Sequence, residues 1–109
     1  MDQRKCPRFP VKFRSSFNSV NVVGGEGIVV DLSFRGCRVS SAVEAQPGTT
    51  LELRIHPSDQ DPPIWVERAV VRWCRNKHFG LEFVSLQPEE WARLQSTVKQ
   101  LELEPYLRS

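Results

Sequence analysis

The sequence predicts an all-β domain that ends in a single α-helix. From residue 10 to residue 84, short alternating or β-branched segments are separated by turn-forming residues, which is typical of an antiparallel sandwich or barrel. After residue 87 the apolar residues change from a two-residue to a helical repeat. With 109 residues the chain is long enough for one domain. We therefore expect five or six strands followed by one helix.

The expected strands are recognised by their alternation and by the turns between them. Val11, Phe13 and Phe17 alternate with polar residues, which predicts a half-buried first strand. Turns that contain glycine, proline or asparagine then separate the later strands. We expect strands over residues 10–18, 28–32, 37–41, 49–55, 64–75 and 78–84, with turns at 24–27, 47–48 and 76–77 and a loop at 56–63.

The end of the chain has the signals of an amphipathic helix. Pro88 suits the first helical position, and Glu89 and Glu90 favour the positive end of the helix dipole. Pro105 disfavours helical geometry at the residue before it and ends the helix. One apolar stripe runs between these residues: Trp91, Leu94, Val98 and Leu101. The stripe either packs on the strands, at one mouth of a barrel or on its side, or docks a partner. Core packing is the favoured interpretation.

The basic residues are concentrated at the beginning of the chain. Lys and Arg number 15 against 13 Asp and Glu, a net charge of +2, which argues against a nucleic-acid-binding protein. Residues 1–14 nevertheless hold five basic side chains against Asp2 alone. A basic arm on a mildly acidic body indicates a local anionic ligand. We divide the single domain, residues 1–109, into a flexible basic arm at 1–9, a β-barrel at 10–86, a C-terminal helix at 87–104 and a tail at 105–109.

The cysteines and the hydropathy favour a cytoplasmic protein. Cys6, Cys37 and Cys74 are odd in number and far apart, which favours reduced thiols. Cys37 and Cys74 lie in strand patterns and are interpreted as small core residues. No apolar run approaches the about 20 residues that span a bilayer, and none resembles a secretory signal. We expect no direct membrane insertion.

No set of residues suggests catalysis. His56 and His78 are isolated and have no metal-ligand spacing, so we interpret both as surface residues and expect no metal. Cys-x-x-Cys, phosphate-loop and nucleophile-elbow motifs are absent. We expect a protein that is not an enzyme and needs no cofactor.

Two short motifs stand out. Arg4 and Arg8 form an Arg-x-x-x-Arg pattern in the basic arm, and Asp31, Ser33 and Gly36 form Asp-x-Ser-x-x-Gly at the end of a strand. Alone, the first could be a solvated tail, and the second could be a Ser-turn that needs its glycine only for the turn. Both occur here in this order, with one predicted strand between them. This combination favours a ligand site over either structural explanation.

In these two motifs the sequence resembles the PilZ family, the bacterial receptor domains for cyclic di-GMP. The segment Arg8-Phe9-Pro10-Val11 looks like the family's entry into its first strand, and a hairpin from Trp73 to Phe83 looks like its late hairpin. The resemblance covers nearly the whole chain and implies a six-stranded antiparallel barrel closed or flanked by one helix. It also implies a stand-alone receptor for one cyclic di-GMP or a stacked pair, whose arm closes over the ligand.

The resemblance implies a set of ligand-binding residues, and their chemistry suits the ligand. The arginine fork matches a phosphate or the O6 and N7 acceptors of guanine, and a carboxylate can accept from guanine N1–H and its exocyclic amine. We expect the main contacts from Arg4, Arg8, Asp31, Ser33 and Gly36, and weaker ones from Lys5, Arg35 and Trp73.

Several expectations concern where these residues point. Because Asp31 and Ser33 are two apart, they should share one strand face, while Val30 and Leu32 face the core. The glycine of the second motif would permit positive φ and close backbone approach. Trp73 either packs in the core, which is slightly favoured, or stacks on a base.

Two other functions were weighed against the receptor. A PilZ-fold adaptor could bind protein without any nucleotide. A small barrel for single-stranded nucleic acid would need a positive groove, which the near-neutral charge disfavours. By resemblance, the output of a receptor would be contact with a protein of motility, secretion or polysaccharide synthesis.

Overall fold

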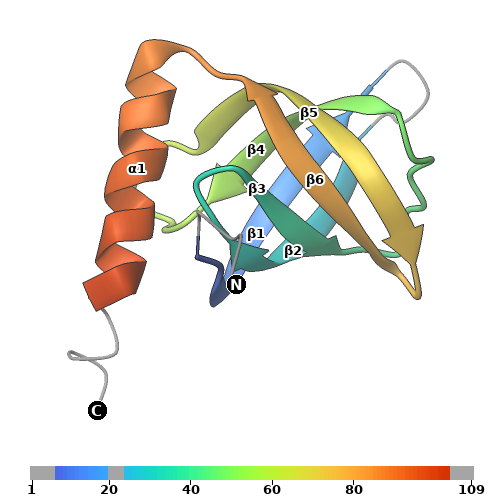
Figure 1. Cartoon of the computed structure of the whole chain (residues 1–109), viewed down its shortest axis with the longest axis horizontal. Helices are drawn as coiled ribbons and strands as arrows, with labels where there is room; N and C mark the ends of the chain where they lie inside the picture. Colours follow the sequence, from blue (N-terminus) through green and yellow to red (C-terminus); the bar gives the residue numbers. More distant parts are fainter. Residues whose placement is uncertain (1–6, 20–23, 104–109) are drawn as a thin grey trace, which may run out of the picture.

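The computed structural model describes residues 7–19 and 24–103 and shows a closed six-stranded barrel with one helix (Figure 1). The elements are β1 (Phe9–Asn18), β2 (Gly25–Leu32), β3 (Gly36–Ser40), β4 (Thr50–His56), β5 (Ile64–Arg75), β6 (His78–Ser85) and α1 (Pro88–Leu103). Neighbouring strands are antiparallel and follow the order β1-β2-β3-β6-β5-β4, with β4 pairing back to β1. The predicted fold class is confirmed, including the six-stranded antiparallel barrel with one helix that the resemblance implies.

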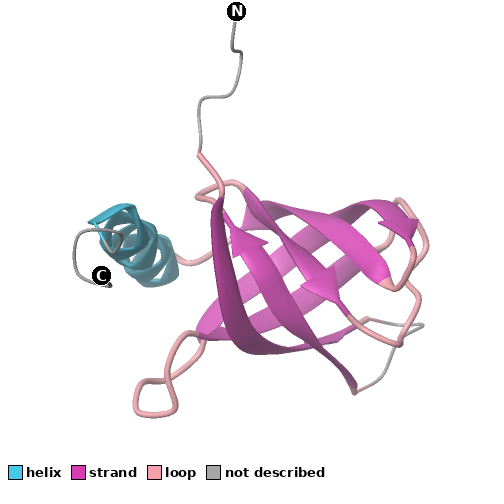
Figure 2. Cartoon of the chain, turned by 90° about the horizontal axis from the view of Figure 1, so that it is seen from below, coloured by secondary structure: helices cyan, strands magenta, loops and turns pink. Residues whose placement is uncertain are grey.

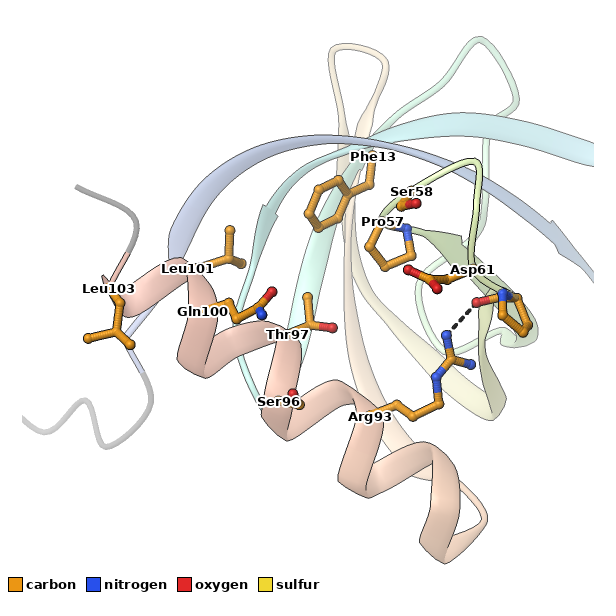
Figure 3. Close-up of a pocket in the computed structure, with 11 residues that line it drawn as sticks. Phe13, Pro57, Ser58, Asp61, Arg93, Ser96, Thr97, Gln100, Leu101 and Leu103 are labelled. Carbon is orange, nitrogen blue, oxygen red and sulfur yellow. Dashed lines mark hydrogen bonds between the residues drawn. The ribbon is translucent and has the colours of Figure 1, made fainter. Parts of the chain in front are cut away.

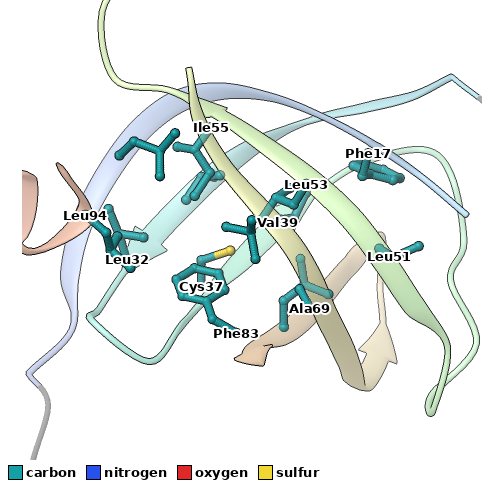
Figure 4. Close-up of a cluster of buried hydrophobic side chains, with 14 of the residues drawn as sticks. Phe17, Leu32, Cys37, Val39, Leu51, Leu53, Ile55, Ala69, Phe83 and Leu94 are labelled. Carbon is teal, nitrogen blue, oxygen red and sulfur yellow. The ribbon is translucent and has the colours of Figure 1, made fainter. Parts of the chain in front are cut away.

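The interior of the barrel is filled by apolar side chains that every strand contributes (Figure 4). Phe17 and Phe79 meet edge to face with ring centroids 5.3 Å apart. The largest fully buried side chains are Phe17, Phe79, Leu32, Leu51, Leu53, Ile55, Ile64, Leu94, Val29, Val39, Val66 and Val71. The half-buried first strand is confirmed, because Val11 and Phe13 pack against this core while the alternating residues Pro10, Lys12 and Arg14 are exposed.

Most of the glycine-rich segment at residues 24–27 belongs to β2, so the predicted turn there is wrong beyond its first residue. Gly24 adopts a positive φ of 70°, but β2 begins at Gly25. A Cβ at Gly25 would overlap the ring of Phe17, and one at Gly27 would lie 2.7 Å from the Ser40 carbonyl oxygen. These glycines therefore make room for neighbouring groups within the barrel.

Two irregularities in strand register change which side chains face outward. The β2–β3 pairing shifts between Val29 and Asp31, so Val29 and Leu32 are both fully buried while Val30 is outside the core cluster. The expectation that Val30 faces the core is wrong for this reason, since a bulge breaks the two-residue alternation. A second register shift, between Val71 and Trp73 in β5, breaks the two-residue alternation of that strand in the same way.

Helix α1 stands across one end of the barrel (Figures 1 and 2). Leu94 and Leu101 are buried, and Trp91 and Val98 pack against the core, so the favoured interpretation of the apolar stripe is confirmed. Its first turns are tied to β5 and to the loop before β5. Glu90 Oε1 accepts a 2.9 Å hydrogen bond from the Trp65 amide, and Arg93 donates to the carbonyl oxygens of residues 62 and 63. Over the described residues, no helix is long and apolar enough to cross a membrane.

Gly36 shows how closely β3 and β6 approach, and it generates a prediction about stability. Its φ is not positive, contrary to expectation, and the close approach that the structure shows is that of the β6 backbone. A Cβ at this position would overlap the carbonyl oxygen of Leu81, which is backbone and cannot rotate away. We expect Gly36→Ala to lower the free energy of unfolding by about 1–3 kcal/mol, measured by urea denaturation.

The matched control is Arg35→Ala at the adjacent, exposed position, which should change stability by less than about 0.5 kcal/mol. Equal stability of the two variants would show that β3 and β6 are not held this closely together.

Candidate ligand-binding site

The two sequence motifs meet at one end of the barrel. Pro10 at the start of β1 is the register partner of Asp31 in β2, which brings the residues before β1 next to that carboxylate. Arg8 Nη1 donates a 2.7 Å hydrogen bond to Asp31 Oδ1, although 23 positions separate the two residues in sequence. The Asp31 side chain is only 18% exposed and that of Arg8 is 45% exposed. Arg4 and Lys5, the other basic residues proposed from the motif, lie outside the described residues.

A second arginine also contacts this carboxylate, and the sequence analysis did not identify it. Arg38 in β3 is the register partner of Asp31, and its Nε lies 3.4 Å from Asp31 Oδ2. Each carboxylate oxygen therefore has its own arginine. The signal that could have found Arg38 is the β2–β3 pairing, but its register depends on the bulge before Asp31.

The site extends as a row across four neighbouring strands. Asp31, Arg38, Gly80 and Trp73 are successive register partners on β2, β3, β6 and β5. The adjacent row consists of buried residues, which assigns the first row to the outer face: Leu32, Cys37, Leu81 and Val71.

Trp73 belongs to this outer face, so the slightly favoured core interpretation is wrong. Its side chain is not part of the core cluster, and its indole occupies the space that a Cβ at Gly80 would need. The bulge after Val71 turns Trp73 outward. The Arg75 guanidinium carbon lies 5.8 Å from the centre of the Trp73 rings, which is within cation–π range.

A cavity of about 250 Å³ lies beside this row. It is lined by Arg8, Arg35, Gly36, Arg72, Trp73, Gly80, Leu81 and Glu82. Arg72 is paired with Glu82, its Nε 2.6 Å from Oε1, whereas the Arg35 guanidinium has no carboxylate partner among the described residues. The volume is below the roughly 300–1,000 Å³ of usual small-molecule pockets, so the cavity suits part of a ligand whose remainder lies on the outer surface.

Ser33 does not share the face of Asp31, contrary to expectation. It lies beyond the end of β2, is 3% exposed, and closes the turn that leads into β3. Its Oγ accepts hydrogen bonds from the amides of Arg35 and Gly36, at 3.2 and 3.1 Å, and lies 3.2 Å from the Gly36 carbonyl oxygen. In this structure Ser33 shapes the turn that presents Arg35.

Cys37 lies directly beneath the site and is an inert core residue. Desolvation by complete burial, together with the nearby Asp31 carboxylate, raises the pKa of its thiol far above the usual value, and Arg8 only partly opposes this. Cys74 is half-buried against the core. The interpretation of both cysteines as small core residues is confirmed.

A larger cavity, of about 780 Å³, lies between α1 and the β4–β5 loop (Figure 3). Its charged lining residues are Arg93 and Asp61, and Arg93 is already engaged with the carbonyl oxygen of Pro63 at 2.8 Å. None of the motif residues lines it. The smaller cavity, where the two motifs meet, is therefore the candidate site. Within the described part of the chain, no group of three or more His, Cys, Asp or Glu residues could hold a metal ion.

Solved structures with this architecture include proteins of known ligand. Escherichia coli YcgR in complex with c-di-GMP superposes with a TM-score of 0.79 at 16% identity, over 97% of this chain and 49% of that one. The Bacillus subtilis inhibitor of motility MotI/DgrA superposes with a TM-score of 0.78 at 18% identity, over 95% of this chain and 53% of that one. The PilZ domain of E. coli YcgR with c-di-GMP gives 0.77 at 13% identity, over 95% of both chains.

These similarities show a shared fold. The chain spans about half the length of the first two proteins and nearly the whole of the third, an isolated domain. No curated protein matches the sequence significantly. The family model for the PilZ domain matches residues 2–100, which include both motifs, the barrel and most of α1. The chain belongs to the PilZ domain family.

Proposed function

We propose that this PilZ domain is a receptor for cyclic di-GMP that signals through contact with another protein. The observation that carries the proposal is the meeting of Arg8 and Asp31, from two separate motifs, beside a cavity that Arg8 and Trp73 line. Two structures of similar fold contain this ligand, both from E. coli YcgR. We also propose a cytoplasmic location, as the sequence analysis expects.

The chemistry of the site suits a dinucleotide with two phosphates and two guanines. Trp73 offers an aromatic surface for one base, worth about 1–3 kcal/mol when a base stacks on it. Arg8 and Arg35 supply forked donors for phosphate or for guanine O6 and N7. Asp31 supplies the acceptor for the guanine N1–H and exocyclic amine. Because the cavity takes only part of the ligand, we propose that residues 1–6, with Arg4 and Lys5, cover the remainder.

Ligand binding would require Arg8 to leave its present partner. An ion pair in which one side chain is as exposed as that of Arg8 contributes only about 0–1 kcal/mol to the free energy of folding. A charge-assisted hydrogen bond to the ligand is worth about 1.5–3 kcal/mol. Because Arg38 also contacts Asp31, the carboxylate keeps a partner, so the exchange is favourable and it moves the residues just before β1. This movement is the conformational change that we propose a partner reads.

A second route of output leads to helix α1. Phe34 lies in the turn between Ser33 and Gly36, and its ring contacts that of Trp91 with centroids 5.1 Å apart. A ligand that repositions this turn would therefore displace a side chain packed on α1. We propose a protein partner of motility, secretion or polysaccharide synthesis, as the sequence resemblance implies.

One observation favours a protein-binding adaptor without nucleotide as the alternative. Arg8 and Asp31 satisfy each other, and Ser33 is fully used in its turn, so the structure explains these motif residues without a ligand. Titration with nucleotides distinguishes the two functions.

Affinity for cyclic di-GMP tests the proposed receptor. We expect the wild-type protein to bind cyclic di-GMP saturably in calorimetric titrations, with much weaker binding of GTP and cyclic di-AMP. Arg8→Ala should weaken binding by about 1.5–3 kcal/mol, because a charge-assisted interaction is lost. The control is Arg14→Ala on β1, where Arg14 pairs with the exposed Asp59, and it should bind like wild type.

Wild-type protein that is folded by circular dichroism but binds no cyclic di-GMP at high micromolar concentration would exclude the receptor. The adaptor would then be the remaining function, and its partner would have to be captured directly.

A further prediction concerns how ligand binding is transmitted to α1. In protein labelled with 5-fluorotryptophan, cyclic di-GMP should shift the ¹⁹F resonances of Trp73 and Trp91. Trp65, which donates to Glu52 on β4 at 2.6 Å, should not move. Phe34→Ala should abolish the shift of Trp91 while changing affinity by less than about threefold, because it removes the ring contact and no charged ligand contact.

Assignment comes from single Trp→Phe variants. A Trp91 resonance that stays fixed while that of Trp73 moves would mean that binding is not communicated to the helix.

A further inference from the structure

Asp31 needs a partner at all times, and the structure supplies two. Its side chain is four-fifths buried, and a carboxylate in such a position is destabilising when left unpaired. Its present short contact is with Arg8, which the proposed function assigns to the ligand. Once Arg8 turns to the ligand, another donor has to hold Asp31.

Arg38 is placed to be that donor. It lies on β3 between Asp31 on one side and Gly80 on the other, so its backbone is fixed within the barrel. Its Nε is 3.4 Å from Asp31 Oδ2, beyond the about 2.7–2.9 Å of a charge-assisted hydrogen bond. The contact can shorten by a small side-chain rotation when Arg8 departs. Its side chain is 45% exposed and has room for that movement.

We propose that Arg38 is a positioning residue for Asp31: it keeps the carboxylate paired and aimed at the guanine edge while Arg8 engages the ligand. This inference rests on the proposed function and adds a residue that lies outside both motifs. Arg38 acts on the ligand only by orienting the Asp31 carboxylate. Its loss should therefore change how well the site discriminates between bases. A direct contact with phosphate would instead affect all cyclic dinucleotides alike.

The test compares the full chain's affinity for cyclic di-GMP and cyclic di-IMP, which lacks only the exocyclic amine of each base. Wild type should prefer cyclic di-GMP by about tenfold or more, because Asp31 loses one charge-assisted hydrogen bond to the analogue. Arg38→Gln should reduce the preference to about threefold or less. Arg38→Lys should restore part of it, since the charge beside Asp31 returns without the guanidinium fork.

Two further variants isolate the pairing with Asp31. Arg54→Gln removes a barrel-surface arginine that is paired with Glu52 in a similar way on β4, and it should keep the wild-type preference. In an Asp31→Asn background, Arg38→Gln should cause no further loss of preference, because the two residues act as a unit. Urea denaturation of each variant verifies that it folds.

The outcomes separate this inference from the function on which it rests. If Arg38→Gln lowers both affinities by the same factor, Arg38 contacts phosphate directly and the positioning role is wrong. An unchanged preference in Arg38→Gln would equally overturn it, while the receptor function stands. Wild-type protein that binds neither dinucleotide would remove the proposed function, and the role of Arg38 with it.

Discussion

The outer face of the barrel can present a precise row of side chains because the inner face is packed by the next residues of the same strands. Asp31 precedes Leu32 and Arg38 follows Cys37, and both inward neighbours are fully buried. Side chains of a strand alternate between its faces, so fixing the inner residue fixes the direction of the outer one. Closure of the barrel leaves no free edge along which the register could slip. The packing of the core therefore determines the geometry of the candidate site on the outer face.

The arginines on that face are paired so that they can exchange their carboxylate partners for other anionic groups. Arg8 is nearly half exposed and Arg72 is more so. Ion pairs of such exposed side chains contribute little to the free energy of folding. Asp31 differs, because its burial makes the loss of every partner expensive. Arg8 before β1 and Arg38 on β3 both contact Asp31, so one of them can leave while the other stays. In the proposed function, Arg8 can therefore turn to an anionic ligand without leaving the Asp31 carboxylate unpaired.

The elements of the fold were predictable because their signals are local. Alternation defined the half-buried β1, and Pro88 with the stripe from Trp91 to Leu101 defined α1. The failures occurred where one extra residue shifts the register. A bulge leaves composition and propensity unchanged, so Val30 and Trp73 were assigned to the wrong face. The pairing of Arg38 with Asp31 was missed for a related reason, since a cross-strand contact depends on the register of two strands together.

The turn between β2 and β3 shows why the motif needed a structure to be interpreted. Its consecutive side chains point in different directions and serve different purposes. Ser33 folds back onto its own backbone, Phe34 packs on α1, and Arg35 lines the cavity. Gly36 then lets β3 pass close to β6. Sequence chemistry alone assigns all polar members of such a motif to the ligand. Burial and hydrogen bonding divide them instead: Ser33 builds the turn, Arg35 is presented to the cavity, and Gly36 lines the cavity as well.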